Sequence, residues 1–349
     1  MNPDFPARPE PGPDYPAHPE PRPDYPAHSE LGPDRRARPE PGPDRPARAE
    51  PRPVVPHPAR LAVGVIGAGR AGIALGAALV RAGHEVVAAS AVSEASVHRA
   101  RAAFPAAVIT EPSQVLRRAD LVLLTVPDDV LPGLVAGLAA TEAPMQGRML
   151  AHASGRHGLA VLEPAARRGG LPLALHPVMT FTGRGDDVDR LAGTCFGVTA
   201  PEVLRPAAEA LVIEMGGEPV FIAEEHRDLY HAALAGAANH LITLVAQAED
   251  LLRAAGVPDP ARLLGPLLSA ALDNALRFGD AGLTGPVARG DADTVAAHVA
   301  ALDAEPSASP AAVAAYIAMA RLTADRALAT GLLKPADAER LLGVLGGRP

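Results

Sequence analysis

The chain has 349 residues, enough for two domains of ordinary size. Hydrophobic residues make up 48% of it, aromatic residues only 3%, and tryptophan is absent, so we expect a core of Ala, Leu and Val in helices and parallel strands. The single cysteine excludes a disulfide framework and a cysteine-rich zinc module, and it fits a reducing, cytoplasmic environment. The formal net charge of −8 argues against a general nucleic-acid-binding protein. The sequence has no run of about 18 apolar residues and no apolar leader, so we expect neither a membrane span nor a secretory signal.

Residues 1–60 have a composition of their own. They hold 19 of the 38 prolines and repeat with a period of ten residues, as in PDFPARPEPG and PDYPAHPEPR. Proline at this density removes backbone donors and blocks helices, so we predict a disordered Pro-rich tail. Ten acidic and nine basic residues nearly cancel here, which excludes a polybasic membrane anchor. The P-x-x-P spacing leaves a second interpretation open, in which the tail recruits a proline-binding partner.

From Leu61 onward, strand patterns alternate with helix patterns. We predict strands at 61–67, 84–90, 120–127, 149–154, 171–177, 194–200 and 218–223. We predict helices at 71–83, 97–104, 128–140 and 202–216. This alternation is typical of right-handed βαβ units whose parallel sheet is covered by helices on both faces. Residues 61–223 are therefore predicted to form a doubly wound α/β domain.

Strand patterns stop after about Ala223. Helices rich in Ala and Leu are predicted at 224–255, 260–278, 291–303, 309–330 and 335–346. Residues 224–349 are therefore predicted to form an all-helical C-terminal domain. Its apolar faces would serve substrate binding or join two copies in a homodimer.

The first predicted strand and helix are joined by a G-x-G-x-x-G loop. The loop consists of Gly67, Ala68, Gly69, Arg70, Ala71 and Gly72. Between a strand and a helix, this pattern is typical of a Rossmann domain that binds a dinucleotide. We expect Gly67 to allow a tight turn, Gly69 to let a pyrophosphate approach the backbone, and Gly72 to let the helix pack closely on the strand. The helix N-terminus supplies free N–H groups for the phosphates.

The end of the second strand favours NADP over NAD as the cofactor. NAD-binding domains usually carry an acidic residue about 20 residues after the loop, where it binds the ribose 2′-hydroxyl. Here the strand is followed by Ser90 and Ser93, and no acid occurs before Glu94. The two serine hydroxyls, with Arg70 close by in the glycine loop, are suited to a 2′-phosphate.

The segment after the strand at 120–127 is a further candidate for cofactor contact. Loops at the carboxyl ends of strands line the ligand crevice in this architecture. Val126, Pro127 and Asp128 are therefore predicted to border the cofactor. Asp128 has two interpretations, as the cap of the following helix or as a group that faces the substrate.

Six strings carry a resemblance to a known family. They are VGVIGAGRAG, TVPDDVL, HASG (152–155), ALHPVMTF (174–181), YHAALAGAANH (230–240) and LTGPVARGDADTV (283–295). Together they resemble proteins that pair a Rossmann-like domain with the domain of unknown function 2520, over about residues 61–347. More distantly, the chain is similar to ketopantoate reductase, pyrroline-5-carboxylate reductase and the β-hydroxyacid dehydrogenases. Those relatives imply an active site between the Rossmann domain and the helical domain.

The resemblance also implies catalytic positions on the first long helix. Ketopantoate reductases and β-hydroxyacid dehydrogenases typically carry Lys and Asn along this helix. By resemblance, His231 takes the place of the Lys, Asn239 takes that of a second Asn, and Ala235 replaces the first. Their spacing of four residues predicts one stripe about 12 Å long on an α-helix. Because histidine titrates near neutral pH, His231 is a candidate general acid, with a packing role as the alternative.

Three more candidates follow two of the predicted strands. His152 and Ser154 come after the strand that starts at Met149, and His176 ends the strand at 171–177. We predict His152 to bind substrate, and Ser154 and His176 to take part in catalysis. His176-Pro177 resembles the His-Pro pair of prephenate dehydrogenases, and a strand terminator is the alternative interpretation. No G-x-S-x-G elbow surrounds Ser154, so a hydrolase nucleophile is not expected.

A Gly/Pro-rich turn in the helical domain supplies the last candidates. Thr284 and Gly285 are predicted to bind a substrate carboxylate, with Arg289 as its counter-charge. Alternatively, Arg289 and Asp291 simply pair and cap the next helix. No metal site is predicted, because the histidines are loosely spaced and no H-E-x-x-H or cysteine pair is present. Cys195 is expected to be a small buried residue of a strand.

These features predict an NADP-dependent oxidoreductase that transfers hydride to a small carbonyl or imine acid. By resemblance, a 2-keto acid of the ketopantoate type is the expected substrate. The alternative is an NADP-binding sensor or scaffold without turnover, since the Lys of the related enzymes is absent. Neither nucleic acid nor a membrane is expected as a partner.

Overall fold

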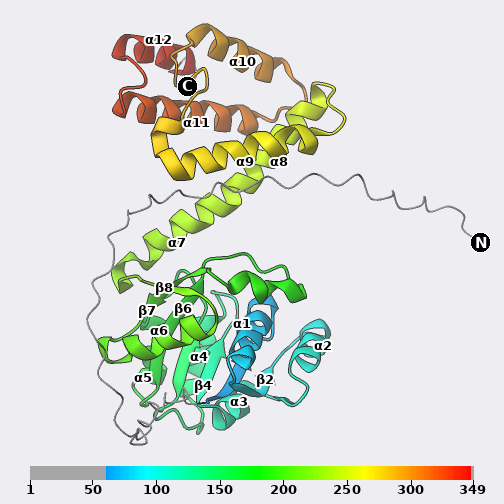
Figure 1. The fold of residues 1–349 in the computed structure, drawn as a ribbon, viewed down its shortest axis with the longest axis vertical. Helices are drawn as coiled ribbons and strands as arrows, with labels where there is room; N and C mark the ends of the chain where they lie inside the picture. Colours follow the sequence, from blue (N-terminus) through cyan, green and yellow to red (C-terminus); the bar gives the residue numbers. More distant parts are fainter. Residues whose placement is uncertain (1–59, 347–349) are drawn as a thin grey trace, which may run out of the picture. The chain divides into compact units, whose positions relative to one another are not determined.

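The structure is a computed structural model that describes residues 60–346 (Figure 1). The predicted Pro-rich tail therefore lies, apart from Arg60, outside the described residues. One eight-stranded sheet has the order β3-β2-β1-β4-β5-β6-β7-β8. The strands are β1 (Ala62–Ile66), β2 (Glu85–Ser90), β3 (Val108–Ile109), β4 (Leu121–Leu124), β5 (Met149–His152), β6 (Leu171–Pro177), β7 (Cys195–Thr199) and β8 (Glu218–Phe221). The α/β fold predicted from the sequence is confirmed, and each of the seven predicted strands is present.

The sheet departs from the prediction at both edges. The two-residue strand β3 was not predicted, because its segment is too short to show an apolar pattern. Strand β7 runs antiparallel to β6 and pairs His176 with Gly197, whereas all the other neighbours are parallel. The carboxyl ends of β1, β4, β5 and β6 therefore lie along one edge of the sheet, where ligands bind in this architecture.

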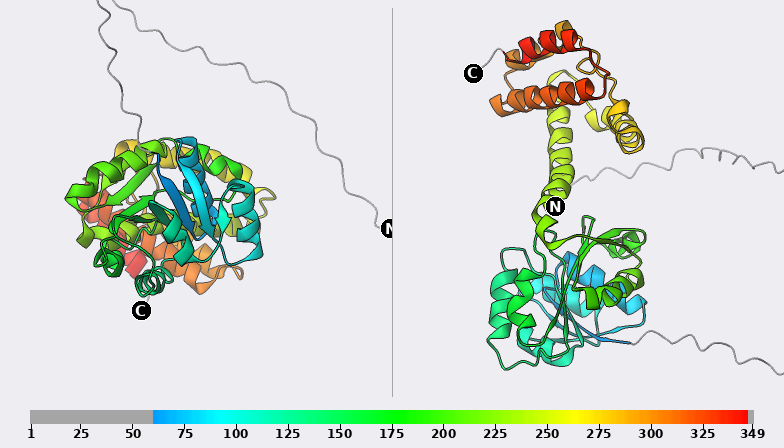
Figure 2. Two further views of the ribbon diagram at one scale, coloured as in Figure 1. Left: turned by 90° about the horizontal axis from the view of Figure 1, so that it is seen from below. Right: turned by 90° about the vertical axis from the view of Figure 1, so that its left-hand side faces the viewer.

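Helices cover both faces of the sheet (Figure 2). They are α1 (Arg70–Arg81), α2 (Glu94–Ala103), α3 (Pro112–Arg118), α4 (Leu131–Ala139), α5 (Glu163–Ala166) and α6 (Arg205–Glu214). Residues of α1, α2 and α6 form one apolar cluster with the side of β1 that carries Val63 and Val65. Residues of α3, α4 and α5 form a second cluster with Ile66 on the other side. This arrangement follows from the strand's period of two, which sends alternate side chains to opposite faces.

One strand residue contradicts the prediction. Cys195 is exposed, whereas a buried position was expected. It is the first residue of β7, next to an exposed turn, and the buried stretch of the strand starts at Phe196. An apolar run in the sequence does not show which residue of a strand enters the core first.

The remaining elements are helices, as predicted. They are α7 (Arg227–Ala235), α8 (Leu241–Ala254), α9 (Pro260–Phe278), α10 (Ala292–Ala304), α11 (Pro310–Ala329) and α12 (Pro335–Gly346). The helices α10, α11 and α12 share a core of small and branched side chains that includes Val295, Ala324 and Leu341. The first predicted helix is interrupted, since a π-helical turn at Gly236–His240 separates α7 from α8.

The helices α8 and α9 bury little of their apolar surface within the described residues. α8 has no buried residue, and α9 buries only Pro260 and Leu264. The helical run Glu224–Ala254 contains an 18-residue window with a mean hydropathy of 1.2, so it is long and apolar enough to cross a membrane by length and composition alone. Polar residues such as Asn239, His240 and Gln247 are spaced along this helical run, so it contains no uninterrupted apolar stretch.

Candidate functional site

The glycine loop adopts a turn that requires its first and last glycines. Gly67 has a φ of +94°, and a Cβ there would lie 2.8 Å from the Thr125 backbone. A Cβ on Gly72 would lie 2.4 Å from both the Gly67 carbonyl oxygen and Thr125 Oγ1. Helix α1 can therefore approach β1 and the end of β4 only because these positions lack side chains.

The start of α1 is open, in contrast to the crowding around Gly67 and Gly72. A Cβ on Gly69 would have no heavy atom closer than 3.9 Å, and no side chain caps the helix. The first-turn N–H groups of an uncapped helix lack partners and carry a partial positive charge. The residues present therefore fit the pyrophosphate of a dinucleotide.

The end of β4 lies directly beside the glycine loop. The Thr125 hydroxyl donates to the Gly67 carbonyl at 2.7 Å, and Val126 lies against the same glycine. The predicted cap role of Asp128 is wrong, because the residue before α4 is Val130 and no side chain caps that helix. Asp128 instead faces the strand ends that follow: its backbone carbonyl is 3.0 Å from His157 Nε2.

The two serines after β2 have structural partners. The Ser90 carbonyl accepts hydrogen bonds from the N–H groups of Gly67 and Ala68, which fixes the glycine turn on β2. Ser93 caps α2: its hydroxyl accepts from the Ser96 N–H at 3.2 Å, and the Ser96 hydroxyl accepts in return from the Ser93 N–H. A phosphate contact by Ser93 would thus compete with the helix cap.

His152 holds the loop that follows β5. Its Nε2–H donates to the Gly158 carbonyl at 2.8 Å, and its Nδ1 accepts from the Ser154 N–H at 3.2 Å. Both ring nitrogens are thus occupied by the loop's own backbone, and the residue is only 1% exposed. This arrangement gives His152 a structural role rather than the predicted contact with substrate. Ser154 is similarly engaged, since its hydroxyl accepts from the His157 N–H.

Arg227 attaches the first turn of α7 to the carboxyl edge of the sheet. It is 2% exposed and donates to Thr199 Oγ1 at 2.8 Å and to the Gly197 carbonyl at 3.0 Å. Longer bonds reach the carbonyls of Gly155 and Ala174. No carboxylate within the described residues forms an ion pair with it. Its charge is therefore held by backbone dipoles and by the face of the Tyr230 ring, 5.6 Å away.

The arginine brings three ring side chains together. Tyr230 and His231, three and four residues after Arg227, occupy the same side of α7. The Tyr230 hydroxyl is 2.7 Å from His176 Nδ1. The His176 ring meets the rings of Tyr230 and His231 edge to face, with centroid distances of 5.6 Å and 6.3 Å. We refer to His176, Tyr230 and His231 as the ring cluster.

Two more glycines make room for the ring cluster. A Cβ on Gly155 would lie 2.7 Å from His231 Cδ2 and 2.9 Å from His176 Nε2. A Cβ on Gly197 would lie 2.2 Å from the Tyr230 hydroxyl oxygen. Both glycines therefore let rings of α7 approach the sheet closely.

Burial and the arginine set the protonation states here. The pKa of His176 is lowered from 6.5 to about 4, chiefly by burial and then by the charges of Arg227 and His231. Burial likewise lowers the pKa of His152 to about 4. Burial raises the pKa of Tyr230, although Arg227 acts in the opposite direction. At neutral pH His176 is therefore uncharged and Tyr230 keeps its proton.

The lowered pKa of His152 predicts acid sensitivity. Between pH 6.5 and 4, His152 is protonated in the unfolded chain but stays neutral in the folded chain. The free energy of unfolding therefore falls as the pH falls through this window. A shift from 6.5 to about 4 corresponds to a loss on the order of 3 kcal/mol. Urea unfolding at a series of pH values measures it. In His152→Gln the free energy of unfolding should depend less on pH than in the wild type. An equal pH dependence in both proteins would show that His152 is not the cause of the acid sensitivity.

Four predicted residues are not joined to the ring cluster by any hydrogen bond, ion pair or ring contact within residues 60–346. The π turn interrupts the predicted stripe, so Asn239 does not follow His231 at α-helical spacing, and it is exposed. Arg289 bonds the Thr284 carbonyl, and Gly285 lies in the same turn. Asp291 caps α10 by accepting from the Thr294 N–H and hydroxyl, as one of the two interpretations of this turn expected, but no ion pair between Asp291 and Arg289 is present among the described residues.

Arg227 and Tyr230 were missed by sequence reasoning. A signal was present, since Arg227, Tyr230 and His231 have the i, i+3, i+4 spacing of one helix face. The partners of this face lie on β6, on β7 and in the loop after β5, between 28 and 72 residues away along the chain. Such contacts cannot be read from local spacing.

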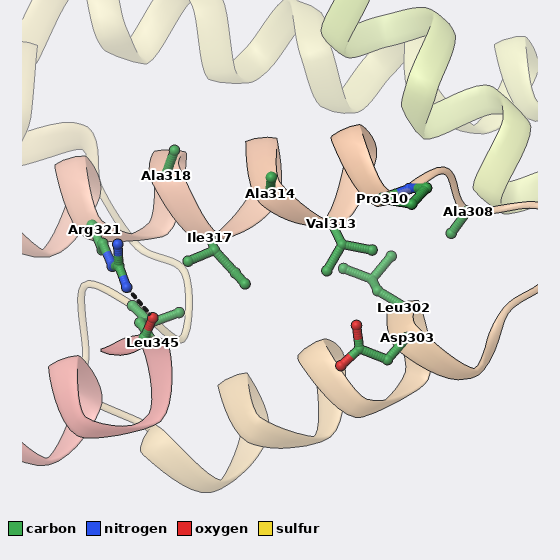
Figure 3. A pocket seen from close by; sticks show the side chains of 10 residues that line it. All are labelled: Leu302, Asp303, Ala308, Pro310, Val313, Ala314, Ile317, Ala318, Arg321 and Leu345. Atoms are coloured by element: carbon green, nitrogen blue, oxygen red, sulfur yellow. Dashed lines mark hydrogen bonds between the residues drawn. The ribbon is translucent and has the colours of Figure 1, made fainter. Parts of the chain in front are cut away.

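A separate cavity lies in the helical part. It has a volume of about 450 Å³ and is lined by α10, α11 and the end of α12 (Figure 3). Val313 and Ile317 give it an apolar wall, and Arg321 bonds the Leu345 carbonyl at one end. It contains no residue of the glycine loop or the ring cluster. Among the described residues, no group of three His, Cys, Asp or Glu side chains is placed to hold a metal ion.

Two family models match the chain. The model of a Rossmann-like domain matches residues 49–177. The model of a domain of unknown function (DUF2520) matches residues 194–323. Together they span the sheet and most of the helical part, as the resemblance in the sequence implied. A search of curated proteins found no match.

Solved structures share the fold. A Bacteroides fragilis protein, provisionally named an NADP oxidoreductase, matches with a TM-score of 0.64 and 21% identity over 76% of this chain and 98% of its own. An imine reductase from Myxococcus stipitatus in complex with NADP⁺ matches with a TM-score of 0.59 and 18% identity, over 80% and 99% of the two chains. The Streptomyces aurantiacus imine reductase matches with a TM-score of 0.56 and 23% identity, over 80% of this chain and 99% of its own.

Proposed function

Since the chain belongs to the proteins that pair a Rossmann-like domain with a domain of unknown function (DUF2520), we propose that it is an NADP-dependent reductase of a small carbonyl or imine compound. The observation that carries the proposal is the position of the ring cluster. His176 ends β6, which is three strands from β1 and its glycine loop in the sheet. Three strand spacings are on the order of 14 Å, so one extended dinucleotide can lie along this edge.

The glycine loop and α1 would hold the pyrophosphate of the cofactor. Arg70 and Ala71 would offer backbone N–H groups, while the Ala68 N–H stays bonded to the Ser90 carbonyl and Ala68 only lines the turn. Val126, Pro127 and Asp128 would border the cofactor beside the loop. When bound, the reduced nicotinamide supplies the hydride that adds to the carbon of the C=O or C=N bond. The fold neighbours that bind NADP⁺ support this choice of cofactor.

The ring cluster would supply the proton that the oxygen or nitrogen of the substrate gains. His231 is the acid in this proposal, since it is partly buried and lies at the end of the cluster that Tyr230 does not cover. In this proposal the Tyr230 hydroxyl donates a hydrogen bond to His176 Nδ1. The neutral His176 ring then carries its own proton on Nε2, beside His231 and Gly155. His176 thereby orients the substrate as a neutral donor. Ser154 is the residue before Gly155, and its predicted part in catalysis belongs to this proposal.

Charge at the ring cluster favours an imine over an acid as substrate. Besides His231, the cation that acts on His176 is Arg227, and its guanidinium is sealed from solvent by four hydrogen bonds. A carboxylate next to the reacting bond would therefore lack a partner there. The imine reductases among the fold neighbours agree with this choice. The ketopantoate-like acid, with Thr284, Gly285 and Arg289 as its contacts, stays a prediction.

Titration of the full chain with NADPH and NADH, followed by assays with cyclic imines and 2-keto acids, tests the proposal. We expect tight NADPH binding and oxidation of NADPH that depends on an imine. Binding of NADPH without turnover of either substrate class would favour the alternative, a nucleotide sensor or scaffold. If the protein binds neither NADPH nor NADH, both the reductase and the nucleotide sensor lose their basis.

His231→Gln should lower kcat by a factor of at least about 100, the usual contribution of a general acid. NADPH affinity should stay unchanged, because the residue lies three strands from the glycine loop. In the wild type, the pH profile of kcat should show a group that must be protonated, and the variant should lack it. His240→Gln, an exposed histidine near the end of the π turn, is the matched control. Equal loss in both variants would remove His231 from its role.

We also propose that α8 and α9 join two copies of the chain. Leu263, Leu267, Leu272 and Leu276 of α9 are between 52% and 80% exposed. Leu263 and Leu272 are 2.5 turns apart, so opposite sides of α9 are apolar. A single copy would leave these leucines in water, and a symmetric homodimer is the commonest way to cover them. A cytoplasmic location, expected from the sequence, is part of this proposal.

Light scattering should therefore give twice the chain mass of 35.7 kDa. Leu267→Glu should shift the protein to monomers or lower its solubility, because the charge would be buried in the interface. Val203→Glu, at an exposed position of the α/β part, should change neither. A monomeric wild type, or one that is recovered only with lipid vesicles, would contradict the proposal.

A further inference from the structure

A second cavity lies against the α/β domain, between α1, α2 and the connection from β6 to β7. Its volume is about 270 Å³. Four arginines line it: Arg70 and Arg81 from α1, Arg99 from α2, and Arg184 from the connection. Apolar side chains form much of the remaining wall, among them Ile73, Ala77 and Val188.

Arg99 is the most informative of the four. Its Nε is buried and has no hydrogen-bond partner. The Arg99 side chain is partly buried, and it lines the cavity. A buried N–H of a guanidinium without an acceptor is costly, so this donor points to an acceptor that binds here.

The positive charge of the cavity is only partly balanced. Arg81 pairs with Asp189 at 2.6 Å. Among the described residues, no carboxylate forms an ion pair with Arg70, Arg99 or Arg184. Arg70 instead donates to the Phe181 carbonyl at 3.3 Å. Three guanidinium groups therefore surround one cavity without a counter-charge of their own.

Asp187 also lines the cavity but does not supply that counter-charge. It is 1% exposed and accepts hydrogen bonds from the Thr182 N–H, the Thr182 hydroxyl and the Gly183 N–H. Its nearest cation is Arg190, at 3.7 Å. Burial opposes its ionisation, yet these bonds and Arg190 lower its pKa overall. The carboxylate is thus committed to shaping the loop that carries Arg184.

The cavity has a fixed wall at Arg70. Gly183 adopts a φ of +82°, and a Cβ there would lie 2.9 Å from Arg70 Cγ. The turn that Asp187 holds therefore presses against the stem of Arg70 and orients its guanidinium. Arg70 is also the first residue of α1, directly after the glycine loop, so the cavity adjoins the proposed cofactor site.

We propose that this cavity binds a phosphate monoester through Arg70, Arg99 and Arg184. Guanidinium groups bind phosphate oxygens in pairs of parallel hydrogen bonds, and a dianion matches three unpaired cations. The ester has two sources, the 2′-phosphate of NADP or a separate phosphorylated small molecule. The first source rests on the proposed function and would make these arginines the basis of selectivity for NADP over NAD. The second does not depend on it.

Calorimetry on the full chain with NADPH, NADH, 2′,5′-ADP, 5′-AMP and inorganic phosphate tests the proposal. If the 2′-phosphate occupies the cavity, Arg99→Gln should weaken NADPH and 2′,5′-ADP at least about tenfold and leave NADH and 5′-AMP unchanged. Arg184→Gln should also weaken the binding of NADPH and 2′,5′-ADP. Arg101→Gln, an exposed arginine of the same helix, is the control and should change nothing.

The other outcomes are also decisive. Binding of inorganic phosphate that is lost in Arg99→Gln, with NADPH affinity unchanged, assigns the cavity to a separate phosphate ester. The same phosphate binding in a protein that binds no dinucleotide would uphold the cavity and overturn the proposed function. If Arg99→Gln and Arg184→Gln leave the affinities for all five ligands unchanged, the cavity is not a phosphate site.

Discussion

Gly72→Ala is expected to destabilise the α/β domain and abolish nucleotide binding. The added methyl would lie 2.4 Å from the Gly67 carbonyl oxygen and from Thr125 Oγ1, both of which are held by the sheet. Since neither neighbour can move without breaking the glycine turn, we expect a loss of about 3 kcal/mol or more in the free energy of unfolding. Urea unfolding and NADPH titration measure the two effects.

Two other glycines serve as controls. Gly133→Ala lies within α4, where a Cβ meets nothing within 4 Å, so it should be neutral or stabilise slightly. Gly69→Ala should leave stability nearly unchanged, because its nearest neighbour is 3.9 Å away. It should still weaken NADPH if the pyrophosphate approaches the backbone there. A stable Gly72→Ala variant with wild-type NADPH affinity would disprove this account of the loop.

Arg227→Met should have the largest effect outside the glycine loop. It removes the donors to Thr199 Oγ1 and to the carbonyls of Gly155, Ala174 and Gly197, while it keeps much of the side-chain volume. A buried acceptor that loses its donor and stays unsatisfied typically costs about 1–3 kcal/mol. We expect a loss of this order in urea unfolding, together with loss of activity.

A second readout separates the charge of Arg227 from its packing. Without this cation the pKa of His176 should rise from about 4, but burial should keep it below 6.5. NMR titration of the histidine ring measures it. Arg227→Lys keeps the charge and should leave the pKa low while it still loses stability. Arg156→Met, an exposed arginine paired with Asp228, should change stability by less than about 0.5 kcal/mol. An unchanged His176 pKa in Arg227→Met would refute the proposed electrostatic role.

The order of the helices and strands was determined by the sequence alone. Hydrophobic period, glycines and prolines are local signals, and they located all seven strands that exceed two residues. They also located the glycine loop, because its requirement for small residues is written in consecutive positions. The same local signals did not reveal the antiparallel strand β7, since the direction of a strand depends on its partner.

The composition of the candidate site was decided by tertiary structure. His176 and His231 were recognised as candidates, but the buried Arg227, which attaches α7 to the sheet, and Tyr230, which contacts His176, were not. Asn239 was misplaced because a π turn, which the sequence does not announce, changes the helix face. His152 looked like a substrate contact until both of its ring nitrogens were seen to bind its own loop.

The physical reason is the range of the interactions involved. Secondary structure depends on neighbours within a few residues, so the sequence by itself determined the α/β and helical elements and the glycine loop. Burial, pKa and the convergence of Arg70, Arg99 and Arg184 depend on contacts between segments about 30 to 115 residues apart. Only the folded chain brings those segments together, and it therefore decided which of the candidate side chains can act as one site.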